Sequence, residues 1–153
     1  MGDIANLDDV DIRICSILSD DGRASNTSIA KKLGISESMV RKRIKRMREE
    51  GLLRIVGYGD PWTLGFPLAT MIFFHIEPKH VLAAAEALTA MKETHFVAVT
   101  SGSADIVVRC AFKSEKSLFD FLFGPVSQIK GLIKTETSLL LNVMKRGGNP
   151  FTS

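Results

Sequence analysis

Basic side chains are the clearest chemical feature of the sequence, and they gather between residues 31 and 48. This segment carries eight bases against one acid, Glu37, whereas residues 1–21 carry six aspartates against Arg13 alone. The net charge of the whole chain is only +3, so its distribution is more informative than its sum. Charge segregated in this way indicates a surface that orients an anionic partner. The bases are Lys31, Lys32, Arg41, Lys42, Arg43, Lys45, Arg46 and Arg48.

A second polar group surrounds Gly102. Glycine permits a tight turn whose backbone N–H groups can donate to a carboxylate, and Asp105 can accept from an ammonium group. These groups could therefore take part in a polar binding site. The same residue types are also ordinary turn formers, so both interpretations stay open. The group comprises Thr100, Ser101, Gly102, Ser103, Ala104 and Asp105.

The remaining reactive residue types form no enzyme motif. His75, His80 and His95 have no metal-ligand spacing with Cys15 or Cys110, and the sequence has no phosphate-binding glycine loop and no nucleophile motif. The two cysteines lie in separate apolar segments and are expected to be small buried hydrophobes. The sequence therefore predicts no catalytic residue, no metal site and no cofactor.

The basic segment is positioned by three predicted helices. Each has a capping residue before its apolar periodicity and a glycine stop after it. Acidic residues in the first turn support a helix that begins at Asp9. The caps are Asp8, Ser25 or Asn26, and Ser36, and the stops are Gly22, Gly34 and Gly51.

The third helix should turn a basic face outward. Val40, Ile44 and Met47 recur at helical spacing and predict its buried side. Ser38, Lys42, Lys45 and Arg46 then point away from the core, and Arg41, Arg43 and Arg48 lie on the flanks. A helix-turn-helix presents its recognition helix to the major groove in this way, although a solvated basic helix remains the alternative. The predicted DNA-binding residues are Ser25, Ser36, Ser38, Met39, Arg41, Lys42, Arg43, Lys45, Arg46 and Arg48.

The second half of the chain alternates strands and helices. Strands are predicted over 68–76, 94–101, 105–112 and 132–144, with helices opened by Pro78 and Ser114. This is the βαββαβ order of a ferredoxin-like sheet, so the fold class is α+β. Both helices lie on one face, and self-association is expected to cover the other. A strand over 53–58 should lead into a turn-rich linker. The predicted divisions are a helix-turn-helix domain at 1–52, a linker strand and hinge at 53–65, a ferredoxin-like domain at 66–146 and a tail at 147–153.

Residues 7–53, LDDVDIRICSILSDDGRASNTSIAKKLGISESMVRKRIKRMREEGLL, resemble the N-terminal half of the Lrp/AsnC (feast/famine) transcription regulators, with the pattern LDxxDxxILxxLxxDGRxSxxxLAxxxGLSxxxVxxRIxRLexxGvI. The segments VTSGSADIVVRC and GLIKTETSLLL are similar to that family's C-terminal domain. The resemblance implies a dimer joined through the linker strand and assembling to a tetramer or octamer. It also implies an amino-acid effector bound between subunits by residues 100–105 together with Thr135.

These observations predict a cytoplasmic, sequence-specific regulator that binds double-stranded DNA and senses a small metabolite. No run approaches the roughly 18 apolar residues of a membrane span, and the acidic N-terminus does not resemble a signal peptide. Two alternatives stay open. One is a haem-pathway decarboxylase of the siroheme type, which shares this architecture and would use His95 and Arg109. The other is a nonspecific architectural DNA-binding protein.

Overall fold

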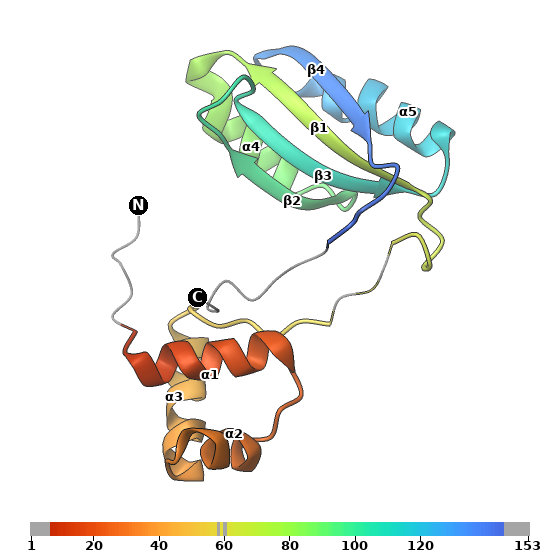
Figure 1. Cartoon of the computed structure of the whole chain (residues 1–153). Helices are drawn as coiled ribbons and strands as arrows, with labels where there is room; N and C mark the ends of the chain where they lie inside the picture. Colours follow the sequence, from red (N-terminus) through yellow and green to blue (C-terminus); the bar gives the residue numbers. More distant parts are fainter. Residues whose placement is uncertain (1–6, 58, 60, 146–153) are drawn as a thin grey trace. The chain divides into compact units, whose positions relative to one another are not determined.

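The computed structural model describes residues 7–57, 59 and 61–145. The described residues form two compact units: a helical unit of residues 7–57, to which residues 144–145 also belong, and a sheet unit that covers residues 59–143 (Figure 1). Each unit has a hydrophobic core of its own. The two units are therefore described separately.

The helical unit consists of α1 (Asp9–Asp20), α2 (Asn26–Leu33) and α3 (Glu37–Glu49). The predicted caps are confirmed: the side chains of Asp8, Ser25 and Ser36 each accept a hydrogen bond from a first-turn backbone N–H. Asp8 and Asp11 form a reciprocal capping box. Gly34 and Gly51 adopt the left-handed conformation, with φ of 69° and 71°, which explains why glycine stops α2 and α3.

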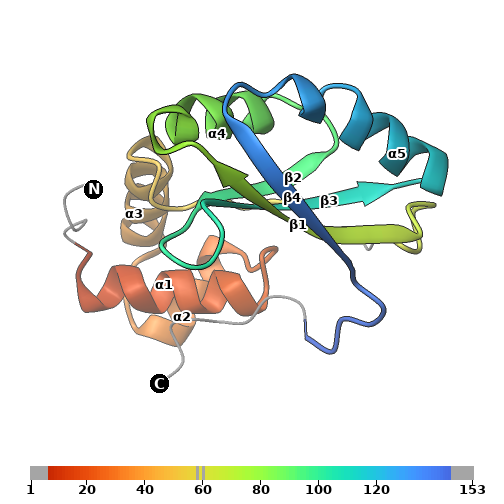
Figure 2. The same ribbon diagram turned by 90° about the horizontal axis from the view of Figure 1, so that it is seen from above.

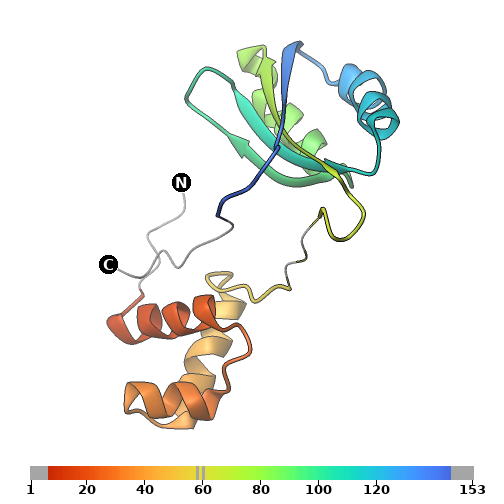
Figure 3. The same ribbon diagram turned by 45° about the vertical axis from the view of Figure 1, so that its right-hand side comes forward.

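The helices enclose a small core, and α3 contacts both α1 and α2 (Figure 3). Apolar residues from all three helices are buried together, as the helical periodicity predicted. This packing fixes which side of α3 faces inward. The buried members are Ile14, Cys15, Leu18, Ile29, Ala30, Val40 and Met47.

The sheet unit has the predicted βαββαβ order. Its helices α4 and α5 cover the same face of the sheet (Figure 2), and short 3-10 turns at Pro78–His80 and Val126–Gln128 accompany them. The antiparallel sheet has the strand order β2-β3-β1-β4. The elements are β1 (Leu68–Ile76), α4 (Val81–Thr89), β2 (Thr94–Val99), β3 (Ile106–Phe112), α5 (Glu115–Phe123) and β4 (Leu132–Leu139).

The two faces of the sheet differ in burial. Ile72, Phe74 and Val108 point toward the helices and are fully buried. The alternate positions face away from α4 and α5, so Phe73 is only half-buried and Phe96 remains 53% exposed. An apolar strip on this open face therefore has no cover from the described part of the chain.

Several predicted strand bounds differ in the described chain: β2 ends at Val99 rather than at residue 101, and β3 begins at Ile106 rather than at residue 105. Residues 53–57 are irregular rather than extended in a sheet, because this segment has no neighbouring strand within the described chain to satisfy its backbone groups; residue 58 lies outside the described residues. The last strand ends at Leu139 instead of continuing to Met144. Leu140 still donates to the Ala69 carbonyl, but only Leu68 of β1 lies beyond that position, and the residue before it is Pro67, which has no backbone N–H to donate.

Candidate nucleic-acid interface and effector loop

The outward face of α3 presents exposed polar and basic side chains. Lys42 and Lys45 are exposed, as are Ser36 and Ser38 at the start of the helix, and Met39 is 45% exposed. Together with neighbouring side chains they line a shallow hollow of about 790 Å³. The predicted face is therefore accessible to a partner, and it offers donors, positive charge and one apolar contact.

The serines of the predicted interface also shape the helices. Ser36 Oγ accepts from Met39 N at 3.2 Å and lies 3.1 Å from Ser38 Oγ. Ser25 Oγ accepts from Ser28 N at 3.1 Å, which caps α2. These hydroxyls lie beside the positive ends of two helix dipoles, an arrangement that favours a phosphate nearby.

One flank of α3 carries an exposed ion-pair network. Arg41 Nη2 lies 2.6 Å from Glu37 Oε1, and Thr27 Oγ1 donates to Glu37 Oε2 at 2.9 Å. Thr27 and then Arg41 hold the pKa of the Glu37 carboxyl below its ordinary value. This network ties the first turn of α3 to α2 across the turn between them.

The other flank differs from the sequence prediction. Arg46 was expected to point outward, but its guanidinium contacts the carboxylate of Asp11 on α1. Arg43 Nη1 lies 2.9 Å from Asp11 Oδ1 and 2.7 Å from Asp8 Oδ2. The physical reason is that Asp11 is fully buried, and a buried carboxylate requires charged partners. Sequence spacing gave no signal of this pairing, because the residues are 32 to 35 positions apart.

The same interactions shift two pKa values. The backbone N–H of Asp11 and then the Arg43 side chain hold the pKa of Asp8 below its ordinary value. The two carboxylates, Asp11 first, raise the pKa of Arg43. Asp8, Asp11, Arg43 and Arg46 form one charged cluster between α1 and α3, which we call the Asp11 cluster.

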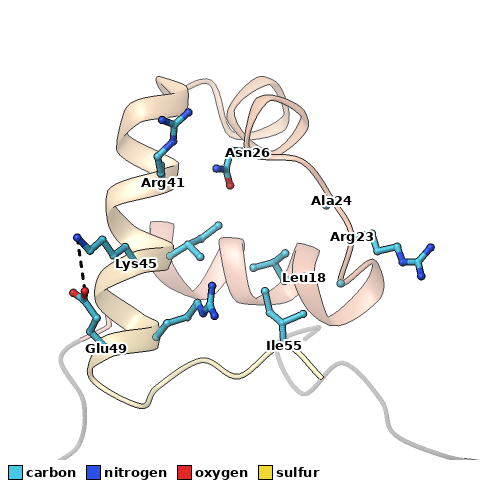
Figure 4. A pocket seen from close by; sticks show the side chains of 11 residues that line it. Leu18, Arg23, Ala24, Asn26, Arg41, Lys45, Glu49 and Ile55 are labelled. Atoms are coloured by element: carbon cyan, nitrogen blue, oxygen red, sulfur yellow. Dashed lines mark ion pairs between the residues drawn. The ribbon is translucent and has the colours of Figure 1, made fainter. Parts of the chain in front are cut away.

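A cleft of about 640 Å³ opens beside α3 (Figure 4). Arg41 and Lys45 extend from α3 on one side, and Arg23 lies on the other, just before α2. Leu18 and Ile55 contribute an apolar floor between them. Arg23 and Asn26, which also lines the cleft, were missing from the predicted set. The signal for Arg23 was its position two residues before Ser25, the α2 cap.

The loop after β2 is held mainly by its own hydrogen bonds. Thr100 Oγ1 donates to the Ala104 carbonyl at 2.5 Å, and Thr100 N donates to the Asp105 carbonyl at 2.9 Å. The Asp105 carboxylate accepts from Ile76 N at 2.8 Å, and Asp105 N donates to the Phe74 carbonyl at 2.9 Å. One oxygen of the carboxylate expected to bind an ammonium group therefore already ties the loop to β1.

The role expected for Gly102 in this loop needs correction. Gly102 has no positive φ, and a Cβ built there would meet nothing within 4 Å, so the turn does not require glycine. Thr135 lies on β4 opposite Phe74 of β1, whereas the loop adjoins β1 from the β3 side. Strand β1 separates Thr135 from residues 100–105 within one chain. Ser101 and Ser103 are exposed.

The described residues also offer little for metal or nucleophilic chemistry. No group of three or more His, Cys, Asp or Glu side chains among them could hold a metal ion. Burial raises the pKa of Cys110 to about 12, so its thiol is not a ready nucleophile. In this part of the chain, no helix has the length and apolar character needed to cross a membrane.

Comparisons with known proteins agree with this geometry. The winged helix-turn-helix DNA-binding family matches residues 7–54, and the Lrp/AsnC ligand-binding domain matches residues 70–150. The chain is 36% identical over 142 residues to an uncharacterized HTH-type transcriptional regulator of Pyrococcus furiosus, covering 92% of this chain and 96% of that protein. It is 33% identical over 140 residues to the HTH-type transcriptional regulator FL11 of the same organism, covering 91% and 92%.

Solved structures share the fold. E. coli AsnC superposes with a TM-score of 0.78 at 23% identity, covering 94% of this chain and 99% of that one. A transcriptional regulator of Neisseria meningitidis in complex with L-Met gives a TM-score of 0.81 at 20% identity, covering 94% and 95%. The relatives are transcriptional regulators, which removes the decarboxylase alternative. This chain belongs to the Lrp/AsnC family of transcriptional regulators, with an N-terminal winged helix-turn-helix and a C-terminal ligand-binding domain.

Proposed function

We propose that this protein is a cytoplasmic regulator that reads a specific double-stranded DNA site through the outward face of α3. The observation that carries the proposal is the exposed row of Ser38, Lys42 and Lys45, opposite the buried Val40 and Met47. In a major groove, lysine donates to guanine and serine pairs with several bases. Met39 supplies an apolar surface for a thymine methyl group.

Contacts to the DNA backbone are assigned to the flanks. Arg23, Arg41 and Arg48 line the cleft of Figure 4, and the capped start of α2 lies nearby with its N–H groups. Phosphate contacts of this kind fix the register of a protein on DNA without reading sequence. Arg43 and Arg46 are left out of this set, because their guanidinium groups contact Asp11.

A second copy of the chain is proposed to cover the open face of the sheet. This face exposes Phe96 on β2 and carries the half-buried Phe73 and Met71 on β1, with Val107 and Arg109 of β3 between them. Exposed apolar groups of this kind favour self-association. A dimer would present two copies of α3, which suits a pseudo-palindromic DNA site. Assembly to a tetramer or octamer is part of the same proposal.

The effector is proposed to be an amino acid bound where the loop at residues 100–105 meets another subunit. Thr135 and the loop lie on opposite sides of β1, so a single chain does not bring them together. The ligand-binding domain of the family and the L-Met complex of the Neisseria regulator support this ligand class. Exposed hydroxyls of Ser101 and Ser103 are available for its polar groups.

The test is a titration of the full-length protein against DNA from upstream of its own gene and against random duplex of equal length, at fixed salt. Lys42→Ala and Lys45→Ala should each weaken binding to the upstream fragment by about tenfold, as expected for loss of a base contact worth 1–3 kcal/mol. Lys92→Ala removes the same charge from an exposed site in the sheet unit and should leave binding unchanged.

Equal binding by wild type and both α3 variants would contradict the assignment of the recognition face. Equal weak binding of wild type to both duplexes would instead favour the architectural alternative. Repeating the titration with a pool of amino acids tests the effector, since an unchanged isotherm and an unchanged assembly state in size-exclusion chromatography with light scattering would contradict an amino-acid ligand.

A further inference from the structure

Asp11 occupies an unusual position for a carboxylate. It lies in the first turn of α1, and it is the one charged residue of the described chain that is fully buried. A carboxylate withdrawn from water is costly unless charged hydrogen-bond donors surround it. Its partners therefore show what the burial accomplishes.

Both oxygens of Asp11 are occupied by α3. Oδ1 accepts from Arg43 Nη1 at 2.9 Å, and Oδ2 accepts from Arg46 Nη2 and from Asp8 N, the latter at 3.3 Å. Arg43 has a second anchor in Asp8 at 2.7 Å. The next ion-pair partner of Arg46 is Glu50 at 3.9 Å, so Asp11 is its main restraint.

Two rows of basic side chains therefore run along α3, one exposed to solvent and one held in ion pairs with α1. Lys42 and Lys45 face outward, and each is followed in sequence by an arginine of the inner row, Arg43 or Arg46, that is turned toward α1. Side-chain exposure differs accordingly: 74% for Lys45 but 23% for Arg43 and 41% for Arg46. Arg43 and Arg46 also line the hollow on this face, but their guanidinium groups are held in ion pairs with Asp11.

A free arginine beside a recognition helix would contact phosphate on any sequence. Each additional phosphate neutralised steepens the dependence of log K on log salt by about 0.9. Such a contact strengthens binding to every duplex, so it favours the many nonspecific sites as much as the operator. Restraining the inner row therefore limits the part of binding that carries no sequence information.

We propose that Asp11 is a positioning residue for DNA recognition, which keeps Arg46 off the phosphate backbone and so limits the part of the affinity that carries no sequence information. The proposal rests on the proposed function, because it assumes that α3 enters the groove. Arg46 is the side chain to test, because neutralising Asp11 would release it, whereas Arg43 would still form its ion pair with Asp8.

The experiment compares Asp11→Asn, Arg46→Met and the double variant in the full chain. Fluorescence anisotropy against random duplex and the upstream fragment is measured from low to moderate salt. In Asp11→Asn the salt slope on random duplex should steepen by about 0.9, and the affinity for random duplex at low salt should rise. Arg46→Met alone should keep the wild-type slope, and adding it to Asp11→Asn should restore that slope.

Two results would overturn the proposal. One is a folded Asp11→Asn variant whose slope is unchanged, and the other is an Arg46→Met variant whose slope is shallower by about 0.9, which would place Arg46 on a phosphate in the wild type. Circular dichroism monitors folding. If Asp11→Asn does not fold, Arg46→Met still decides, because it keeps the Asp11–Arg43 pair. If the proposed function itself is wrong, the Lys42→Ala variant will discriminate between the upstream fragment and random duplex as well as the wild type does. That result is distinct from failure of the Asp11 proposal.

Discussion

The outward face of α3 and the loop at residues 100–105 are the two surfaces assigned to partners, and they differ in how their polar groups are used. Lys42 is exposed and makes no ion pair with the described residues, and the nearest partner of Lys45 is Glu49 at 3.8 Å. In the loop, the Thr100 hydroxyl and one Asp105 oxygen already have partners at 2.5 and 2.8 Å.

This difference indicates how complete each site is within one chain. A recognition helix is a single rigid element whose outward side chains are available to contact DNA. The loop has satisfied much of its hydrogen bonding within the sheet unit, and Thr135 lies across β1 from it. The proposed ligand site, with Thr135, would need groups from a second copy, so we expect assembly and effector binding to be coupled, whereas the side chains of the proposed DNA face all come from one chain.

The largest expected effect separates structural from functional glycines in the sheet unit. Gly131 has φ of 78°, and a Cβ there would lie 2.6 to 2.9 Å from three side-chain atoms of His80. Gly131→Ala should therefore lower the free energy of unfolding by about 2–4 kcal/mol. Gly102→Ala, where a Cβ meets open space, should change it by less than about 1 kcal/mol. Urea denaturation followed by circular dichroism measures both.

The Gly102→Ala variant then isolates the surface role of the loop. With stability preserved, a change in assembly or in the response to amino acids would be a property of the loop surface itself. If Gly102→Ala proved as destabilising as Gly131→Ala, the loop conformation described above would be wrong.

The helices of the helical unit could be predicted from the sequence because the residues that start and end them act locally. Each helix begins at a capping side chain that bonds within its own first turn, as Ser36 does with Met39 N at 3.2 Å, and α2 and α3 end at glycines with positive φ. The direction of Lys42 and Lys45 follows from helical periodicity once Val40 is placed inward. The βαββαβ order was readable for the same reason.

The features that were missed depend on distant partners. Arg46 bonds to Asp11 across 35 positions, and side-chain periodicity alone placed it outward. Residues 53–57 have the composition of a strand, but a strand exists only beside another, and the described chain provides none. The hydrogen bond between Asp105 and Ile76 depends on the way the end of β1 meets the loop, which no local pattern reveals.

A smaller effect tests whether Asp105 serves the fold, the ligand or both. Asp105→Ala removes the acceptor for Ile76 N and should cost about 1–2 kcal/mol in the free energy of unfolding. Asp105→Asn keeps an acceptor oxygen and should cost less than about 0.5 kcal/mol, but it removes the charge that an ammonium group needs. Loss of the amino-acid response in Asp105→Asn with stability retained would assign the carboxylate to the ligand. An unaltered response would leave Asp105 with the structural role alone.

The smallest effect concerns acid and compares the two units directly. Asp8 and Glu37 have folded-state pKa values lowered by their partners, from ordinary values of 3.8 and 4.5. Each therefore stabilises the helical unit at pH above its ordinary value, and this stabilisation is lost as the pH falls through the lower folded-state pKa. In the sheet unit, Lys134 lowers the pKa of Glu136 in the same direction.

Because two such carboxylates support the helical unit and Glu136 supports the sheet unit, the helical unit should lose more stability between pH 5 and about pH 3. Urea titrations followed by NMR resolve the units through isoleucine methyl signals, with Ile14 and Ile29 in the helical core and Ile72 and Ile106 in the sheet core. In the double variant Asp8→Asn, Glu37→Gln the two units should show more similar pH dependence. Equal acid sensitivity of both cores in the wild type would mean that these exposed ion pairs contribute nothing measurable to the stability of the helical unit.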